Sequence, residues 1–475
     1  MMKKIDMIVK TGHMYTMAGE KSGYMYGKSL AIDGGRILAI EDSDVIAQEY
    51  CAEKEIDASR MLVMPGLIDG HMHTGHGVIR GMAQDVSRWM MQNMAPLERA
   101  RSSEAKTAGS ELAIAEAILS GTTTIGDDGS DMEGALSFID RAGVRGNVSV
   151  RVREVPIKAY AAGELYPFDK AYGEKTFSEA LRLYDKFHNK DGERIKVRFG
   201  PQGADFLSLE LLLKCHEEAK RKQTKVHMHL EQGTREDEQM KKRYGKTAVE
   251  LLSPYGFFDK DFVGIHMTAA TQEEVETVVR GGGSMIMCPN SIGVTCGVVV
   301  PGYEFDHAGG QVGLGTDQAA GNNSHNIFSE MKAAAILTKV KHQSATIMPA
   351  WKVVRMATIE GAKALGIDHL TGSLEVGKSA DLILLNLAEP TLAPVYTEPI
   401  RNFLPNIVYA ARGQEVDTVI VNGKVLVEHR VPQTFDMKEI LCNAQHYAEE
   451  IAAGSAEAFT MLRGENVVYM EQGLL

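Results

Sequence analysis

The chain has 475 residues, of which 44% are apolar and 24% charged, and its formal net charge is −12. The length suits one large domain and a smaller one, and the negative charge argues against a nucleic-acid backbone as the main partner. No window approaches the roughly 18 consecutive apolar residues of a membrane span. Five scattered cysteines without a CxxC motif indicate a reducing cytoplasm. We therefore expect a cytoplasmic protein that binds a small molecule, and neither nucleic acid nor membrane.

The two ends of the chain are rich in predicted strands. Glycine-containing turns at 34–35 and 422–423 each lie between two β-prone runs, which is a hairpin signal. We expect segments 1–62 and 372–435 to meet in one small β domain that a central domain interrupts. Residues 436–475, rich in Ala and Glu, are predicted to form a helical tail.

The central segment, 63–371, has a different rhythm, because apolar strand candidates alternate with amphipathic helical runs. The strand candidates are residues 62–73, 122–128, 147–154, 194–201, 224–231, 262–267, 284–290 and 311–317. Eight strand–helix alternations predict an α/β fold, a closed parallel (β/α)8 barrel. Polar residues gather at the ends of these strands, and the carboxyl ends of the strands carry the active site in such barrels.

Histidines at the predicted strand ends indicate a metal site. Residues i and i+2 of a strand point to the same face, so His71 and His73 can direct two imidazoles at one point. A single HxH is weak evidence, but His229 ends a second HxH on another strand. His266 and Asp317 end two further strands. Three histidines and one aspartate leave a coordination position for water, which is typical of a catalytic metal site.

Several motifs together resemble one family. "PGLIDGHMH", "HMHLEQ", "GIHMT", "GTDQAAGNNSHN" and "GSLEVGKSADLILL" are similar to sequences of the amidohydrolase superfamily, and most of all to its deaminase and chlorohydrolase branch. The similarity covers nearly the whole chain. It implies a distorted TIM barrel with a small β-sandwich built from both chain ends, and an enzyme that forms homo-oligomers.

The resemblance also implies roles for the strand-end residues. His71, His73, His229 and Asp317 match the family's metal ligands, and Asp317 also takes a proton from the attacking water. His266 matches the histidine beside the bound water or substrate. The fourth strand ends "RFGPQ" without the lysine that bridges two metals in some relatives, so we expect one divalent ion. Zinc is the first expectation, with iron and manganese as alternatives.

Two positions depart from the family pattern. Gln232 stands where the deaminase branch has a Glu that shuttles a proton, and a carboxamide cannot do this. Three explanations stay open: Glu231 takes the role, Asp317 makes all proton transfers, or the reaction needs no ring protonation. Gln202 stands where many nucleoside deaminases have a substrate-contacting histidine, which makes the predicted pocket more amide-like.

Other candidates face the substrate. Trp89, in the family's substrate-covering loop, is a candidate to stack on a flat ring. Arg151 or Arg153 is a candidate to bind a carboxylate or carbonyl, with structural pairing an equal alternative, and Asn290 is a further candidate at a strand end.

Several neighbouring residues have structural interpretations. His227 is interpreted as a packed barrel histidine, and Cys288 as buried and inert. His76 and His325 are interpreted as solvated or substrate-facing. Asp127 and Asp128 are expected to bond loop amides or a histidine.

The sequence thus predicts a metal-dependent hydrolase, a deaminase that acts on an aminated N-heterocycle of the purine, pyrimidine, pterin or s-triazine type through metal-activated hydroxide. One alternative is hydrolysis of a C–Cl, C–NHR or cyclic amide bond at the same site. Another is a metal-binding homologue without turnover.

Overall fold

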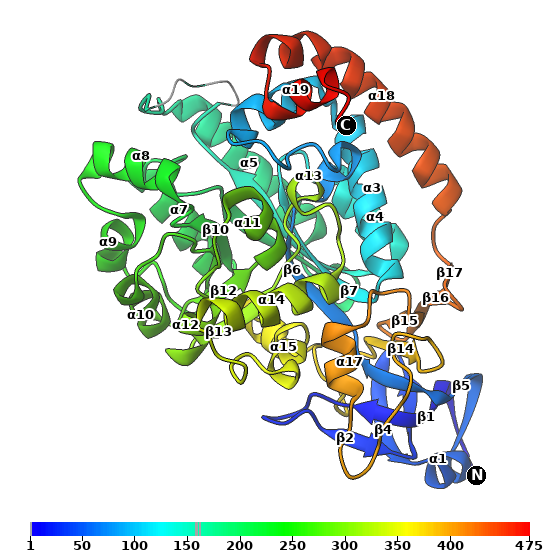
Figure 1. Cartoon of the computed structure of the whole chain (residues 1–475). Coiled ribbons are helices and arrows are strands. Elements are labelled where there is room, and N and C mark those ends of the chain that lie inside the picture. The colour runs from blue at the N-terminus through cyan, green and yellow to red at the C-terminus, as the bar shows by residue number, and fades with distance from the viewer. Residues whose placement is uncertain (1, 157–159, 161–162) are drawn as a thin grey trace.

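The computed structural model describes residues 2–156, 160 and 163–475. The described residues form a parallel eight-stranded barrel surrounded by helices and a separate sheet built from both parts of the chain that flank it (Figure 1). This confirms the predicted fold class. In the described part of the chain, no helix combines the length and the apolar character that crossing a bilayer requires.

The barrel strands follow one another in space in the order of the sequence, from β6 to β13. Nearly all their residues are buried, because helices cover the outside of the barrel and side chains fill its interior. Each predicted strand segment overlaps one of them. Their bounds are β6 Leu67–Met72, β7 Thr122–Gly129, β8 Arg145–Val152, β9 Ile195–Pro201, β10 Val226–Leu230, β11 Phe262–His266, β12 Ser284–Met287 and β13 Gln311–Leu314.

Helices connect the barrel strands, and side-chain caps fix where several begin. Ser102 accepts a hydrogen bond from the amide of Ala105 at the start of α3, and Thr271 with Glu274 forms a capping box at α10. The helical segments after β6 are η1 Thr74–Ile79, η2 Met90–Met94, α2 Ala95–Ala100, α3 Ser103–Leu119, α4 Glu133–Ala142, α5 Lys170–Phe187, α6 Lys190–Glu193, α7 Leu209–Arg221, α8 Thr234–Tyr244, α9 Ala248–Leu252, η3 Ser253–Tyr255, α10 Gln272–Gly281, α11 Pro289–Cys296, α12 Gly302–His307, α13 Ala319–Asn322, α14 Ile327–Lys341, α15 Ala350–Met356 and α16 Ile359–Leu365.

The first and last barrel strands meet over a short seam at their carboxyl ends. Met72 and Asp317 form an isolated parallel bridge. The amide of His73 donates to the carbonyl of Asp317 at 2.9 Å, and the amide of Asp317 donates to the carbonyl of His71 at 2.8 Å. Gly315 permits this approach, because a Cβ there would lie 2.8 Å from both the backbone N and the backbone O of His71. The closure of the barrel therefore brings three predicted ligands together.

The separate sheet joins strands from both sides of the barrel segment, in the order β17-β16-β15-β14-β5-β1-β3-β4, with β2 paired to β1. The two parts of the chain join in an antiparallel strand pair in which Val63 lies opposite Leu384. The predicted hairpin turns at 34–35 and 422–423 are confirmed by the β3–β4 and β15–β16 pairs. The strands are β1 Lys3–Tyr15, β2 Tyr24–Tyr26, β3 Lys28–Asp33, β4 Arg36–Asp42, β5 Tyr50–Pro65, β14 Leu382–Asn386, β15 Val416–Val421, β16 Lys424–Glu428 and β17 Val431–Pro432.

The junction between sheet and barrel lies at Gly66, because β5 continues to Pro65 and β6 begins at Leu67, a few residues after the expected boundary. Two short helices accompany the sheet, α1 Ser43–Glu49 and α17 Phe403–Tyr409.

The C-terminal residues form the helices α18 Met437–Leu462 and α19 Glu465–Glu471, which run from the sheet along the barrel to its far end (Figure 1). Ala444 and Ile451 of α18 join an apolar cluster with Met94 and Leu97, and Trp89 packs against that cluster. The tail thus supports the loop that follows the first barrel strand.

Candidate metal and active site

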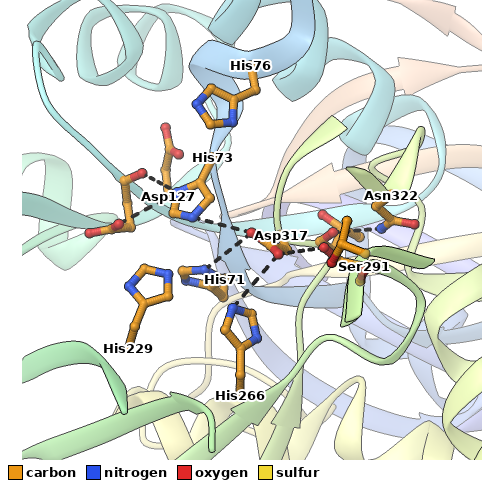
Figure 2. Close-up of polar contacts among 12 residues, drawn as sticks. His71, His73, His76, Asp127, His229, His266, Ser291, Asp317 and Asn322 are labelled. Atoms are coloured by element: carbon orange, nitrogen blue, oxygen red, sulfur yellow. Dashed lines mark hydrogen bonds and ion pairs between the residues drawn. The ribbon is translucent and has the colours of Figure 1, made fainter. Parts of the chain in front are cut away.

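Five predicted side chains converge at the carboxyl end of the barrel (Figure 2). Oδ1 of Asp317 lies 3.3 Å from Nε2 of His73 and 3.8 Å from Nε2 of His71, and Oδ2 lies 3.8 Å from Nε2 of His266. Ligand-capable atoms of His71, His229 and His266 all lie within 4.8 Å of one another. The predicted ligands from β6, β10 and the end of β13 therefore face a common centre, with His266 beside them.

Hydrogen bonds on the far side of each ring fix three of these histidines. Nδ1 of His73 donates to the carbonyl of Asp128 at 2.7 Å, and Nδ1 of His229 donates to the carbonyl of Gln202 at 2.8 Å. Nδ1 of His71 lies 2.9 Å from Nε2 of His227. Such outer contacts are typical of metal-ligating histidines, because they leave Nε2 free for the ion.

The chemistry of the centre fits a divalent ion. Nε2 of His71 and both ring nitrogens of His266 are buried and have no hydrogen-bond partner among the described residues. Burial, with the neighbouring charged groups, lowers the pKa of His71, His73 and His229 well below its usual range. Neutral imidazoles are the form that binds a metal, so these three histidines and Asp317 are the residues that would hold it.

The Asp317 carboxylate is held by a residue that the sequence did not single out. Oγ of Ser291 donates to Oδ2 of Asp317 at 2.6 Å. Burial raises the pKa of Asp317 to about 7, and the Ser291 hydrogen bond opposes this shift. Asp317 itself has a positive φ of 61°, an uncommon backbone conformation that the seam stabilises. Ser291 lies on α11 after β12, where no periodicity or motif marks it.

Asn290 does not face the cavity, contrary to the prediction. Its backbone amide and its Nδ2 donate to the carboxylate of Glu330 at 3.1 and 2.9 Å. Nδ2 of Asn322 also donates to Glu330, at 2.7 Å. Burial raises the pKa of Glu330 to about 7, although these hydrogen bonds oppose the shift. Asn290 therefore supports the segment that carries Ser291.

A cavity of ≈ 230 Å³ opens onto the metal-ligand group. Of the predicted substrate-binding residues, Trp89, Arg151 and Gln202 line it, together with Gln232. Other lining residues are His73, His76, Met91, Met94, Glu98, Arg101, Arg153, Tyr166, Phe206, His229, Ile292 and Asp317. The pocket thus combines aromatic and thioether surfaces with amides and arginines, which suits a flat polar heterocycle.

The structure separates Glu231 from Gln232. Oε1 of Glu231 accepts a hydrogen bond from the amide of Val249 at 3.1 Å, at the start of α9, and Glu231 does not line the cavity. Gln232 lines the cavity, and its Oε1 accepts from Arg235 at 3.1 Å. The expectation that Glu231 takes the place of the family's proton-shuttling residue therefore finds no support in the geometry. Of the two acidic candidates, only Asp317 faces the cavity.

Both candidate arginines line the cavity, Arg151 from β8 and Arg153 from the residue after its end, but their partners differ. Arg151 pairs with Oδ2 of Asp128 at 2.5 Å, so its charge is already compensated. Arg153 lies over the ring of Phe206 and donates from Nε to the carbonyl of Val155 at 2.6 Å. Among the described residues, no carboxylate pairs with Arg153.

Asp127 and Asp128 behave as predicted. Oδ1 of Asp127 accepts from the loop amide of Thr74 at 2.9 Å, and the carbonyl of Asp128 holds His73. Both therefore organise the loop and the ligand that follow β6.

The predictions for two other histidines, His76 and His325, have different outcomes. Nε2 of His76 lies 2.8 Å from Oε1 of Glu98 at the cavity wall, which agrees with a substrate-facing position. His325 is buried, and its Nδ1 lies 2.9 Å from Oγ1 of Thr316. The interpretation of His325 as solvated or substrate-facing is therefore wrong. Cys288 is buried, as predicted, and burial raises the pKa of its thiol well above the usual range.

Comparison with known proteins agrees with this geometry. A sequence profile described as Amidohydrolase family matches residues 62–426. The chain is 33% identical to a 5'-deoxyadenosine deaminase of Methanosarcina acetivorans over 94% of this chain and 99% of the relative. It is 30% identical to a 5-methylthioadenosine/S-adenosylhomocysteine deaminase of Thermoanaerobacter pseudethanolicus over 94% and 99% of the two chains.

Solved structures show the same architecture. An adenosine deaminase from Xanthomonas campestris with bound zinc superposes with a TM-score of 0.87 at 25% identity, over 95% of this chain and 100% of that one. An atrazine chlorohydrolase from Arthrobacter aurescens in complex with zinc has a TM-score of 0.83 at 19% identity, over 93% and 100%, and this similarity concerns the fold.

Proposed function

Because the chain belongs to the amidohydrolase family, we propose that it removes the amino group of an adenosine-type nucleoside by hydrolysis and releases ammonia. The enzyme is a hydrolase of non-peptide C–N bonds, as its deaminase relatives are. The observation that carries the proposal is the convergence of neutral imidazoles and one carboxylate beside a cavity with an aromatic wall.

The metal would be held by His71, His73, His229 and Asp317. A divalent ion bound there supplies Lewis-acid chemistry, which lowers the pKa of a coordinated water to about 7. Asp317 is positioned as the base that takes a proton from the attacking water, since Ser291 fixes one of its oxygens. His266, whose ring nitrogens lack partners among the described residues, is placed to donate a hydrogen bond to the oxygen as it bonds to the ring carbon.

The amino group must be protonated before the C–N bond breaks, so that it leaves as ammonia, and the proton taken from water is therefore returned to the amino nitrogen. Of the two predicted proton carriers, Glu231 and Asp317, only Asp317 lines the cavity, and we assign both transfers to it. Gln202 and Gln232 contribute amides that donate and accept at once, and Oε1 of Gln202 is buried without a partner among the described residues. These amides are suited to hold the ring's nitrogen edge rather than to move a proton.

The test is ammonia release from metal-loaded enzyme with adenosine, 5'-deoxyadenosine, 5'-methylthioadenosine, S-adenosylhomocysteine, guanine and cytosine. We expect release from at least one adenosine-type compound, together with the absorbance change of the adenine-to-hypoxanthine conversion. Asp317→Asn should abolish this release. Metal-loaded enzyme that leaves every adenine compound intact would overturn the proposal.

A second candidate keeps the site and changes the leaving group to chloride, an alkylamine or the nitrogen of a cyclic amide. Gln232 favours it, because a good leaving group needs less acid assistance than ammonia. Turnover of adenosine and 6-chloropurine riboside, which share one ring system, separates the two: a large preference for chloride release would favour the second candidate.

Three further assignments belong to the same proposal. We take the ion to be a single zinc, supported by the donor set and by the zinc in two structural neighbours. All five cysteines are free, which supports a reducing cytoplasmic location. We further propose a homo-oligomer, which gel filtration with light scattering tests directly.

A further inference from the structure

A second cavity, of ≈ 390 Å³, lies at the opposite end of the barrel from the metal-ligand group. Its walls come from the amino-terminal sides of β9, β10 and β11 and from the residues after α16. We call it the basal pocket and define it by Lys196, Arg198, Lys225, Lys260 and the segment 365–367. None of these residues takes part in the reaction proposed above.

The basal pocket is cationic in a chain whose net charge is −12. Four cationic residues line it, Lys196, Arg198, Lys225 and Lys260, and two carboxylates, Glu193 and Asp261. Glu193 is already engaged, because its Oε1 pairs with Lys196 at 2.6 Å.

Three of the cations have no ion-pair partner in the described part of the chain, although the carboxylates of Asp259 and Asp261 lie near Lys225 and oppose the lowering of its pKa. Within the described residues, Arg198, Lys225 and Lys260 form no ion pair, although Lys225 donates from Nζ to the carbonyl of Lys260.

Arg198 is the residue that points to a ligand. It is only 3% exposed, and its Nη2 donates to the carbonyl of Leu365. Its Nη1 is buried and has no hydrogen-bond partner among the described residues, yet the side chain lines the pocket. Burial lowers the pKa of Arg198 to about 9 and that of Lys225 to about 8, which reflects the cost of holding these charges without a partner.

A guanidinium stays charged in proteins, and a buried charge without a partner is costly. An anion bound in the pocket would offset the cost of this buried charge. A planar guanidinium beside two flexible ammonium groups matches a tetrahedral oxyanion. We propose that the basal pocket is a binding site for a phosphate group. Arg198 contacts two of its oxygens, and Lys225 and Lys260 neutralise the remaining charge.

Calorimetric titration of the metal-loaded enzyme with inorganic phosphate, at constant ionic strength, tests the proposal. We expect one phosphate per chain at this site, bound at least about 10-fold more weakly by Arg198→Met and measurably more weakly by Lys225→Met. If Arg198→Met does not fold, Lys260→Met tests the same site, because Lys260 is exposed and its substitution does not disturb the core. Lys241→Met, which removes an exposed cation of α8, is the matched control and should bind phosphate like the wild type.

Asp317→Asn tests whether phosphate binds in the basal pocket or at the metal-ligand end of the barrel. It alters only the metal-ligand end, so it should leave phosphate affinity unchanged. Adenosine monophosphate in place of phosphate shows whether the phosphate group is taken free or as part of a nucleotide, and competition with inorganic phosphate assigns both to one site. The proposal is overturned by absent phosphate binding, by equal affinity in wild type, Arg198→Met and Lys260→Met, by affinity lost in Asp317→Asn alone, or by chloride binding as tightly as phosphate.

Discussion

Nδ1 of His71 lies 2.9 Å from Nε2 of His227, and the two rings stack at an angle of 22°. His227 is therefore a packed barrel histidine, as predicted, but it also engages Nδ1 of His71 and so leaves Nε2 for the proposed metal. A histidine of this kind acts on the ion through its neighbour.

The first prediction concerns this contact. His227→Ala should lower zinc affinity about 10- to 100-fold, because His71 loses the hydrogen bond that orients it. Zinc retention during competition with a chromogenic chelator measures the change, and His227→Gln should recover part of it. His216→Ala, which removes a buried histidine of α7 that pairs with Asp259, is the control and should retain zinc normally. If wild type and His227→Ala retained zinc equally, His227 would have no role in orienting His71.

Gln232 and Glu231 should respond differently to substitution. Gln232→Ala should lower kcat/KM about 10-fold or more, because a cavity-lining amide is lost, and should leave the pH profile unchanged, because a carboxamide does not titrate. Glu231→Gln should leave kcat within about 3-fold of the wild type, since its carboxylate bonds Val249 outside the cavity. A loss of kcat in Glu231→Gln together with a shifted pH profile would restore Glu231 as a proton carrier.

Trp89 should bind the substrate ring. Trp89→Ala should raise KM about 10-fold with little change in kcat, because stacking on a flat base contributes roughly 1–3 kcal/mol. Trp351, the second of the two tryptophans, is 48% exposed, and Trp351→Phe should leave both constants unchanged. The Trp351→Phe enzyme then has Trp89 as its single tryptophan, whose fluorescence should change on substrate binding. Constant fluorescence at saturating substrate would contradict the stacking role.

Glu330 should make stability depend on pH. Its pKa is about 7 when folded and lower when unfolded, so its contribution is full at low pH and is lost as pH rises through 7. Between about pH 5 and pH 8 the loss amounts to about 2 kcal/mol. Urea unfolding should show a flatter pH dependence in Glu330→Gln than in the wild type, whereas Glu457→Gln, at an exposed position of α18, should match the wild type.

Removal of the metal should loosen the seam of the barrel. The first and last strands meet through two backbone hydrogen bonds at Asp317, and the ligands lie on both sides of them. Zinc at 1,000 times its Kd stabilises the folded state by about 4 kcal/mol, which chelation removes. Hydrogen exchange should accelerate at the amides of His73 and Asp317 more than at that of Met228, in the middle of β10. Uniform exchange across all barrel strands would contradict a local effect.

Strand period and barrel topology predict that His71, His73, His229 and Asp317 lie close together, because alternate residues share a strand face and the carboxyl ends of barrel strands converge. The choice of these four as metal ligands, with His227 left out, rests on the family resemblance and stays a prediction. Ser291, by contrast, depends on the path of the short helix after β12, which no periodicity encodes.

The misplaced residues share a cause. Glu231 and Asn290 end predicted strands but lie one and three residues beyond the observed β10 and β12, and His325 lies on the loop between α13 and α14, where the backbone turns. Glu231 has a positive φ of 49°, so its side chain leaves the face that strand alternation assigns. Side-chain direction can therefore be predicted within the strands, whereas just after them it depends on the local turn of the backbone.

The pairing of Val63 with Leu384 has a consequence for how the protein is made. During synthesis on the ribosome, β5 emerges long before β14 exists, so one long edge of the nascent sheet waits unpaired while the entire barrel is translated. The sheet is completed only after the barrel has had time to fold, and a truncated chain that stops before β14 would expose that edge permanently.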